Sequence, residues 1–189
     1  MPVTINGTNG LVTATSYAGS GSSLTGITTG KILQVVEAVK TSPASTSTTT
    51  YNAISGLQPQ ITPSSSSNKV MIFINLKWGF SNENNDVNFK LFRSIGGTET
   101  EIFFGDANGS NSLGFYGAQD ALGKGIHIMM PVCSQYLDSP NTTSQITYLI
   151  KWQVQRSNSY NYLNRPGYND TTVSYHRASS SVTLMEVEA

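Results

Sequence analysis

Two segments of this chain have an apolar side chain at every second position, a pattern that is typical of half-buried β-strands. In Lys69–Trp78 every second residue is apolar, and Gln145–Gln155 repeats the pattern. Residues two apart share one face of a strand, whereas a helix needs apolar residues three and four apart. The expected inward-facing residues are Val70, Ile72, Ile74, Leu76 and Trp78 in the first segment and Ile146, Tyr148, Ile150, Trp152 and Val154 in the second. The sequence therefore predicts two strands that contribute to one core.

Shorter apolar runs, separated by Gly, Pro, Ser and Asn, predict further strands. They cover residues 31–39, 48–54, 60–63, 87–93, 99–104, 126–133 and 182–187. Gly96-Gly97 between two of these runs is a hairpin signal. Because no segment with helical periodicity separates them, we expect an all-β domain over residues 31–189, an antiparallel β-sandwich that is jelly-roll-like.

Residues 1–30 have a different composition from the rest. They contain no charged residue and are dense in Gly, Ser and Thr. Their apolar residues stand apart from one another and include Ile5, Leu11, Val12, Tyr17, Leu24 and Ile27. Such a segment buries too little surface to offset its ordering entropy, so a partner or copies of itself must order it. We therefore expect an N-terminal attachment arm.

The run Lys31–Val39 is apolar on both faces, which is unusual for an antiparallel sheet with one solvated side. Simple alternation places Leu33, Val35 and Val39 on one face and groups Ile32, Val36 and Ala38 on the other. Burial of both faces indicates a second buried surface beside the core. The sequence predicts a subunit interface at Ile32, Val36 and Ala38.

The charge content excludes two classes of partner. Lys and Arg number 11, Asp and Glu number 11, and charged residues make up 12% of the chain, against about 25% in typical domains. Phosphate backbones and anionic membrane surfaces both need clustered Lys and Arg, so we expect neither nucleic acid nor membrane as a partner.

The N-terminus has no signal-peptide pattern. The single cysteine, Cys133, lies in an apolar run, where a buried, inert thiol is expected.

Candidate catalytic groups are scarce. His127 lies in the same apolar run as Cys133, where a core histidine is expected, and His176 lies in a polar loop. No nucleophile elbow, phosphate-binding loop or CxxC pair is present. Asp106–Asn111 begins like a calcium loop, but its glycine is at the fourth position and no closing Glu follows, so an ordinary turn is expected. We predict no enzymatic activity and no cofactor.

The segment Arg156–Arg177 combines tyrosines, arginines and asparagines. Its candidate contact residues are Tyr160, Tyr162, Arg165, Tyr168, Tyr175 and Arg177. Tyrosine supplies rigid contact area, and Arg and Asn supply hydrogen bonds. Three interpretations remain open: packing of a long loop or of a trimer seam, contact with another protein, or stacking on a sugar.

Three stretches resemble fibre and decoration proteins of tailed bacteriophages, notably marine and cyanobacterial phages. They are GLVTATSYAGSGSSLTGI (10–27), GKILQVVEAVKT (30–41) with GLQPQITPSSSSNKVMI (56–72), and YHRASSSVTLMEVEA (175–189). Together they cover roughly half of the chain, and none is a catalytic motif. The resemblance implies a homotrimeric β-sandwich knob on a virion. With one cysteine and no signal-peptide pattern, we expect the protein to be made in the host cytoplasm.

The arm length favours one place on the virion over another. Thirty residues extend at most about 100 Å, and no shaft or adaptor domain is visible in the sequence. We therefore favour a capsid decoration (cement) protein or short head fibre, whose arm binds the major capsid protein or another virion protein. A tail-fibre receptor-binding knob and a carbohydrate-binding lectin module that recognises a host surface glycan are the alternatives.

Overall fold

The computed structural model describes residues 31–81, 86–118, 126–156, 158–168 and 176–189, and within these ranges all regular structure is β-strand. This confirms the predicted all-β class. The strands are β1 (Ile32–Lys40), β2 (Ala44–Thr46), β3 (Asn52–Ala53), β4 (Gln60–Ile61), β5 (Lys69–Phe80), β6 (Val87–Ile95), β7 (Thr98–Phe103), β8 (Tyr116–Ala118), β9 (Met130–Asp138), β10 (Ile146–Val154), β11 (Asn161–Leu163) and β12 (Ser180–Val187).

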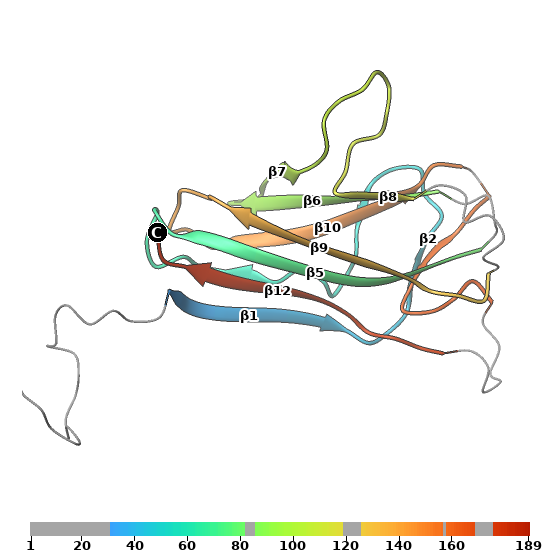
Figure 1. Cartoon of the computed structure of the whole chain (residues 1–189), viewed down its shortest axis with the longest axis horizontal. Helices are drawn as coiled ribbons and strands as arrows, with labels where there is room; N and C mark the ends of the chain where they lie inside the picture. The colour runs from blue at the N-terminus through green and yellow to red at the C-terminus, as the bar shows by residue number, and fades with distance from the viewer. Residues whose placement is uncertain (1–30, 82–85, 119–125, 157, 169–175) are drawn as a thin grey trace, which may run out of the picture. The chain divides into compact units, whose positions relative to one another are not determined.

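The strands form two antiparallel sheets that pack face to face (Figure 1). In sheet A, β12 and β11 pair with β5, β1 and β2 pair outside them, and β9 pairs with the opposite side of β5. In sheet B, β10 and β6 are central, β3 and β4 flank β10, and β7 and β8 flank β6. Strands β1 and β9 are therefore the two edges of sheet A over most of its length.

The core lies between the two sheets and is built from the alternating residues of β5 and β10. All ten residues predicted to face inward on these strands are at most 2% exposed, which confirms the predicted core faces. Trp152 stacks on Phe89 at 6.1 Å between ring centroids, and Trp78 lies 5.2 Å from Phe80. At one side of the sandwich, Phe103 of sheet B stacks on Tyr136 of sheet A at 4.8 Å.

The β6–β7 hairpin has the turn that the sequence indicates. Gly96 and Gly97 join β6 to β7 with φ of 57° and 85°. Positive φ at both central residues is the requirement of a type I′ turn, whose twist matches that of the flanking strands. Gly-Gly therefore sets the register of this hairpin.

Two predicted strands are placed differently by the structure. Thr48–Ile54 is not one strand, because the hydroxyls of Thr46 and Thr48 accept hydrogen bonds from the backbone two residues on and turn the chain. The run Ile126–Cys133 becomes a strand only at Met130, where pairing with Trp78 begins, and it continues to Asp138.

The shift in β9 also changes the surroundings of two residues. Cys133 pairs with Asn75 on the outer side of sheet A and is exposed, so the expected buried thiol is wrong. His127 lies outside any strand and is exposed beside Tyr168, so the expected core histidine is wrong as well. The apolar run around these residues does not show which of its side chains point inward. In the structure Val132, and not Cys133, faces the core.

Buried asparagines fix the chain around β11. Asn161 is fully buried, accepts a hydrogen bond of 2.9 Å from Trp78 Nε1 and donates to the carbonyl of Gln153 at 2.8 Å. Asn164 is also fully buried, donates to the carbonyl of Lys40 at 2.7 Å and accepts from the Ser180 hydroxyl at 2.6 Å. A buried amide needs such partners, so these two residues are structural.

A buried ion pair joins the two sheets at the end of β9. Asp138 is 3% exposed and accepts hydrogen bonds from Arg93 at 2.9 and 3.0 Å and from the Tyr148 hydroxyl at 2.7 Å. Burial, and then the charge of Asp138, raise the pKa of Tyr148 well above its ordinary value. The tyrosine therefore remains a hydrogen-bond donor to this carboxylate.

A second buried carboxylate, Glu186 of β12, joins this strand to β1 and to the loop before β5 through hydrogen bonds. It is 1% exposed and accepts hydrogen bonds from Asn68 Nδ2 at 2.6 Å, from the backbone and hydroxyl of Ser64 at 2.7 Å each, and from Gln34 Nε2 at 2.6 Å. Burial alone would raise the pKa of this carboxyl. The hydrogen bonds outweigh burial and lower the pKa from 4.5 to about 2.

Replacement of Glu186 by Gln should therefore destabilise the domain at neutral pH. The amide would turn an N–H group toward donors that now bind a carboxylate, and we expect a loss of about 1–3 kcal/mol in the free energy of unfolding. Because the folded-state pKa is depressed, this contribution is complete above about pH 4.5 and is lost as the pH falls toward 2. Urea unfolding between pH 7 and pH 2.5 measures both effects.

The matched control is Glu188→Gln, since Glu188 is a more exposed carboxyl two residues away whose ion pair with Lys31 spans 3.8 Å. It should change stability little at any pH. Equal stability of the Glu186→Gln variant and the native protein at pH 7 would contradict the assigned role of this carboxylate.

Truncation of the two alternating strands tests the core. Ile72→Ala and Ile150→Ala each remove a fully packed side chain, and we expect a cost of about 2–5 kcal/mol in unfolding free energy. Thr100→Ala, at an exposed position of β7, should change it by less than about 0.5 kcal/mol. Thermal and denaturant unfolding measure the difference, and native-like melting of both isoleucine variants would refute the packing described.

Candidate functional site

The outer face of sheet A carries most of the exposed apolar side chains of the described residues. Nine large apolar residues are exposed among the described residues of the chain. Six of them lie on β1, β5 and β9, and these are Ile32, Leu33, Val35, Val39, Phe73 and Leu137. Isolated exposed apolar residues are ordinary, whereas a contiguous set marks a contact surface. We call this set, with Met71, Met185 and Val187, the sheet A outer face.

Strand register makes these residues neighbours although they are far apart in sequence. Val35 pairs with Met185, Met185 with Met71, and Met71 with Leu137, so one apolar row crosses β1, β12, β5 and β9. These four strands lie side by side in Figure 1. Phe73 follows in the next row, between Thr183 and Gln135. The row is a continuous apolar strip from one edge of the sheet to the other.

A β-bulge in β1 changes the face that sequence alternation predicts for Ile32. Ile32 pairs with Val187 and Gln34 with Glu186, so Leu33 is an extra residue on β1. The bulge reverses the alternation, and Ile32 therefore shares the outer face with Val35 and Val39.

The same register turns Val36 and Ala38 inward. They pair with Leu184 and Val182, both fully buried, and Val36 packs against the core. The expected grouping of Ile32 with Val36 and Ala38 is therefore wrong, because simple alternation takes no account of the extra residue. Only Ile32 of the three lies on the sheet A outer face.

Few charges interrupt this surface. Its outward rows contain Glu37 on β1 and Lys69 and Lys77 on β5. Lys77 donates to Asn75, and Glu37 accepts from Thr183. Beside them, a shallow hollow of about 370 Å³ lies between β5 and β9 and is lined by Phe73 and Cys133. The composition suits contact with another apolar surface rather than with an ion or a phosphate.

The predicted tyrosine-rich contact segment is partly a packed structure. Tyr160 and Tyr162 stack with ring centroids 6.2 Å apart, and the Arg165 guanidinium lies 3.6 Å from the Tyr162 ring centroid. Arg165 also donates to the carbonyls of Pro166 and Gly167. Tyr162 and Arg165 are thus engaged within the domain, which corresponds to the packing interpretation for these two residues.

The other candidates of that segment are exposed or lie outside the described residues. Tyr160 and Tyr168 are 46% and 43% exposed, and Tyr168 lies against His127 at 5.3 Å between centroids. Arg177 is exposed, and Tyr175 lies outside the described residues. Among the described residues of this segment, ring contacts join Tyr160 to Tyr162 and Arg165 to Tyr162, and a further one joins Tyr168 to His127.

Several other predictions fall outside the described residues or concern ordinary turns. The arm residues Ile5, Leu11, Val12, Tyr17, Leu24 and Ile27 lie in the range 1–30, which the structure does not describe. The Asp106–Asn111 stretch is an exposed loop in which the Asn111 amide donates to the carbonyl of Asn108. Over the described ranges, no three His, Cys, Asp or Glu side chains gather as a metal site. No helix among the described residues is long and apolar enough to cross a membrane.

Comparison with known proteins gives a distant structural likeness only. No protein-family model matches the chain, and no curated protein does. A structure of infectious bursal disease virus, Gt strain, is similar with a TM-score of 0.41 and 12% identity, over 82% of this chain and 42% of that chain. The VP2 subviral particle of infectious bursal disease virus is similar with a TM-score of 0.36 and 13% identity, over 82% of this chain and 40% of that one. This chain spans less than half the length of these viral chains, and likeness at this level carries no functional conclusion.

Proposed function

We propose that this chain is a non-enzymatic structural protein of a bacteriophage virion. In this proposal residues 31–189 form a knob that associates with two further copies, and residues 1–30 attach the knob to the particle. The phage assignment depends on the sequence resemblance of residues 10–27, 30–41, 56–72 and 175–189 described above. The observation that carries the association is the sheet A outer face, where six large apolar residues are exposed together.

The sheet A outer face supports association because its exposure is costly for a single domain. Val35, Val39 and Ile32 are each more than half exposed, although the core of the sandwich is complete without them. Burial of apolar surface is the dominant favourable contribution to most protein–protein association. A cyclic oligomer buries this face on every copy and leaves no open end, which is the usual arrangement of identical subunits.

The position of β1 adds a second argument for self-association. It is an edge strand, and its outward residues include Val35 and Val39, without a charge other than Glu37 among the paired rows. Long apolar edge strands promote pairing with other chains unless they are protected. A neighbouring copy supplies that protection and places β1 in the interface, the strand for which the sequence predicts burial on both faces.

Within the virion, we favour a capsid decoration (cement) protein or a short head fibre, with the major capsid protein or another virion protein as the partner of the arm. The alternative is a tail-fibre receptor-binding knob. Copy number per particle separates them, since hundreds of copies fit the capsid and a few to a few dozen fit the tail. Quantitative mass spectrometry of purified particles measures this number.

A charge placed on the sheet A outer face should dissociate the oligomer. We expect the native chain to be a trimer at micromolar concentration and Val35→Glu to be a folded monomer. An unpaired carboxylate buried in the interface costs about 3–5 kcal/mol, and in a monomer Val35 is 56% exposed, so the fold should tolerate the change. Multi-angle light scattering reports the mass, and circular dichroism reports the fold.

The matched control is Thr100→Glu, which adds the same charge at an exposed position of β7 in sheet B. It should remain trimeric. A monomeric native chain, or a trimer that survives Val35→Glu, would rule out this surface as the interface.

Deletion of residues 1–29 should leave a folded knob that no longer binds particles. The core cluster lies entirely within the described part of residues 31–189, and a domain with its own core folds independently. An arm without charges would bind through backbone hydrogen bonds and small apolar pockets, so binding by the full chain should resist high salt.

Co-sedimentation with particles that lack this protein, at low and at high salt, tests the division of roles. Binding by the truncated chain would place attachment in residues 31–189. Loss of full-length binding in high salt would show an electrostatic contact and contradict the proposed mode of attachment.

A further inference from the structure

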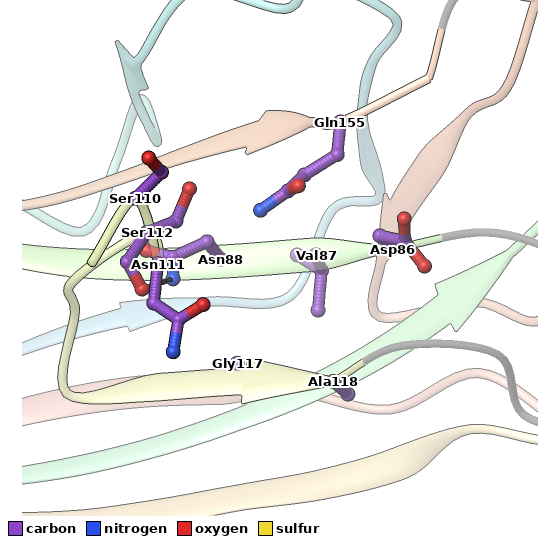
Figure 2. Close-up of a pocket in the computed structure, with 9 residues that line it drawn as sticks. All are labelled: Asp86, Val87, Asn88, Ser110, Asn111, Ser112, Gly117, Ala118 and Gln155. Atoms are coloured by element: carbon purple, nitrogen blue, oxygen red, sulfur yellow. Dashed lines mark hydrogen bonds between the residues drawn. The ribbon is translucent and has the colours of Figure 1, made fainter. Parts of the chain in front are cut away.

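The outer side of sheet B is polar and hollowed, in contrast to the sheet A outer face. Two hollows of about 420 and 390 Å³ lie where the loop 104–115 between β7 and β8 meets β6, and both are lined by Ser110, Asn111 and Ser112. The first also contains Asp86, Asn88 and Gln155 (Figure 2). The second also contains Tyr51, Lys90, Glu101 and Phe104. Residues from five separate stretches of sequence therefore converge on one surface.

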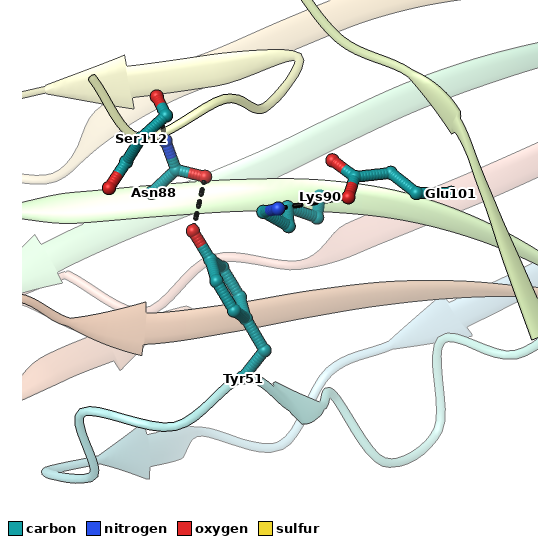
Figure 3. A network of polar contacts seen from close by, with 5 residues as sticks. All are labelled: Tyr51, Asn88, Lys90, Glu101 and Ser112. Atoms are coloured by element: carbon teal, nitrogen blue, oxygen red, sulfur yellow. Dashed lines mark hydrogen bonds and ion pairs between the residues drawn. The ribbon is translucent and has the colours of Figure 1, made fainter. Parts of the chain in front are cut away.

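The floor between the hollows is fixed by Asn88, which is 4% exposed. Its side chain accepts a hydrogen bond of 3.0 Å from the Tyr51 hydroxyl and donates to the carbonyl of Ser112 at 3.4 Å (Figure 3). Burial, and then the charge of Glu101, raise the pKa of Tyr51 to about 12, so its hydroxyl remains a donor. The loop and strand β6 are thus joined through one side chain.

Gly114 allows the loop to lie this close to β6. A Cβ atom at this position would lie 2.4 Å from Asn88 Oδ1 and 2.5 Å from the carbonyl oxygen of Phe89. In the same loop, Gly105 has open space within 4 Å where its Cβ would be. The Phe115 amide donates to the same Phe89 carbonyl at 3.0 Å, and this hydrogen bond also holds the loop against β6.

The hollows contain two carboxylates whose charges are already balanced. Lys90 lies 2.9 Å from Glu101 Oε2, and Arg156 lies 3.2 Å from Asp86 Oδ2. The second oxygen of each, Asp86 Oδ1 and Glu101 Oε1, is buried and has no hydrogen-bond partner in the described part of the chain. Neither oxygen is accessible to a ligand at the surface. Because Lys90 is paired with Glu101 and Arg156 with Asp86, the described lining of the two hollows offers no unpaired cation to an acidic ligand, and a neutral ligand fits better.

We propose that the two hollows together bind a neutral saccharide. The exposed side chains of Asn111 and Gln155, with the hydroxyls of Ser110 and Ser112, would form hydrogen bonds with the hydroxyl groups of the sugar. Phe104 is 52% exposed at the second hollow and offers an apolar surface for the C–H face of a sugar ring. A small number of convergent polar groups beside an aromatic surface is typical of small-molecule sites. The site is independent of the virion assignment and of the sheet A outer face.

An array of neutral and acidic oligosaccharides, probed with the full-length chain, tests the proposal. We expect binding to neutral members. Gln155→Ala, Asn111→Ala and Phe104→Ala alter exposed side chains, so folding should be unchanged. Each should raise the dissociation constant of a neutral member found to bind by roughly 2- to 10-fold, which is the effect of one removed hydrogen bond or stacking contact.

Three further variants, one disruptive and two controls, test the position of the site. Gly114→Ala should abolish binding because it displaces the loop, whereas Gly105→Ala should bind like the native chain. Tyr160→Ala, on the other exposed aromatic surface, should also bind normally. Light scattering on the same samples keeps this result separate from the oligomeric state.

Several outcomes overturn the proposal. They are the absence of binding to any neutral oligosaccharide, binding that the Gln155, Asn111 and Phe104 variants leave unchanged, and binding that requires added Ca²⁺ or an acidic sugar. Loss of binding in Tyr160→Ala alone would move the sugar site to the tyrosine segment and equally contradict the assignment to these hollows.

Discussion

The structure depends on the burial of two apolar strand faces against each other. Alternate residues of β5 and β10 face one another across the sandwich, with Trp78 and Trp152 as their largest members. Fixing a strand in this way also fixes where its other residues point, because neighbouring side chains lie on opposite faces. Each sheet therefore presents an outer face, and the residues that alternate with the core residues decide the chemistry of that face.

The two outer faces have opposite chemistry. Sheet A presents Val35, Met185, Met71 and Leu137 in one apolar row, whereas sheet B presents amides, hydroxyls and paired charges around Asn88. A domain that conceals one outer face in an oligomer and keeps the other toward solvent can combine assembly with recognition. The proposals for self-association and for saccharide binding use different faces for this reason.

Polar groups inside the sandwich stabilise a particular arrangement of its strands. Glu186, Asp138 and Asn161 are each nearly or fully buried and have defined partners in distant parts of the sequence. A buried polar group without partners costs about 1–3 kcal/mol. A shifted register would separate these groups from their partners, so they favour the observed pairing over its alternatives.

The sequence by itself determined the all-β class, the inward faces of β5 and β10 and the Gly96-Gly97 hairpin, because these depend on neighbours along the chain. The tertiary structure decided that Ile32 faces outward, that Cys133 is exposed, and that Tyr51, Asn88, Glu101 and Gln155 surround one polar surface. Each of these depends on a bulge, on where pairing begins, or on contact between strands distant in sequence. Local alternation contains no information about strand register, and register sets which side chains meet.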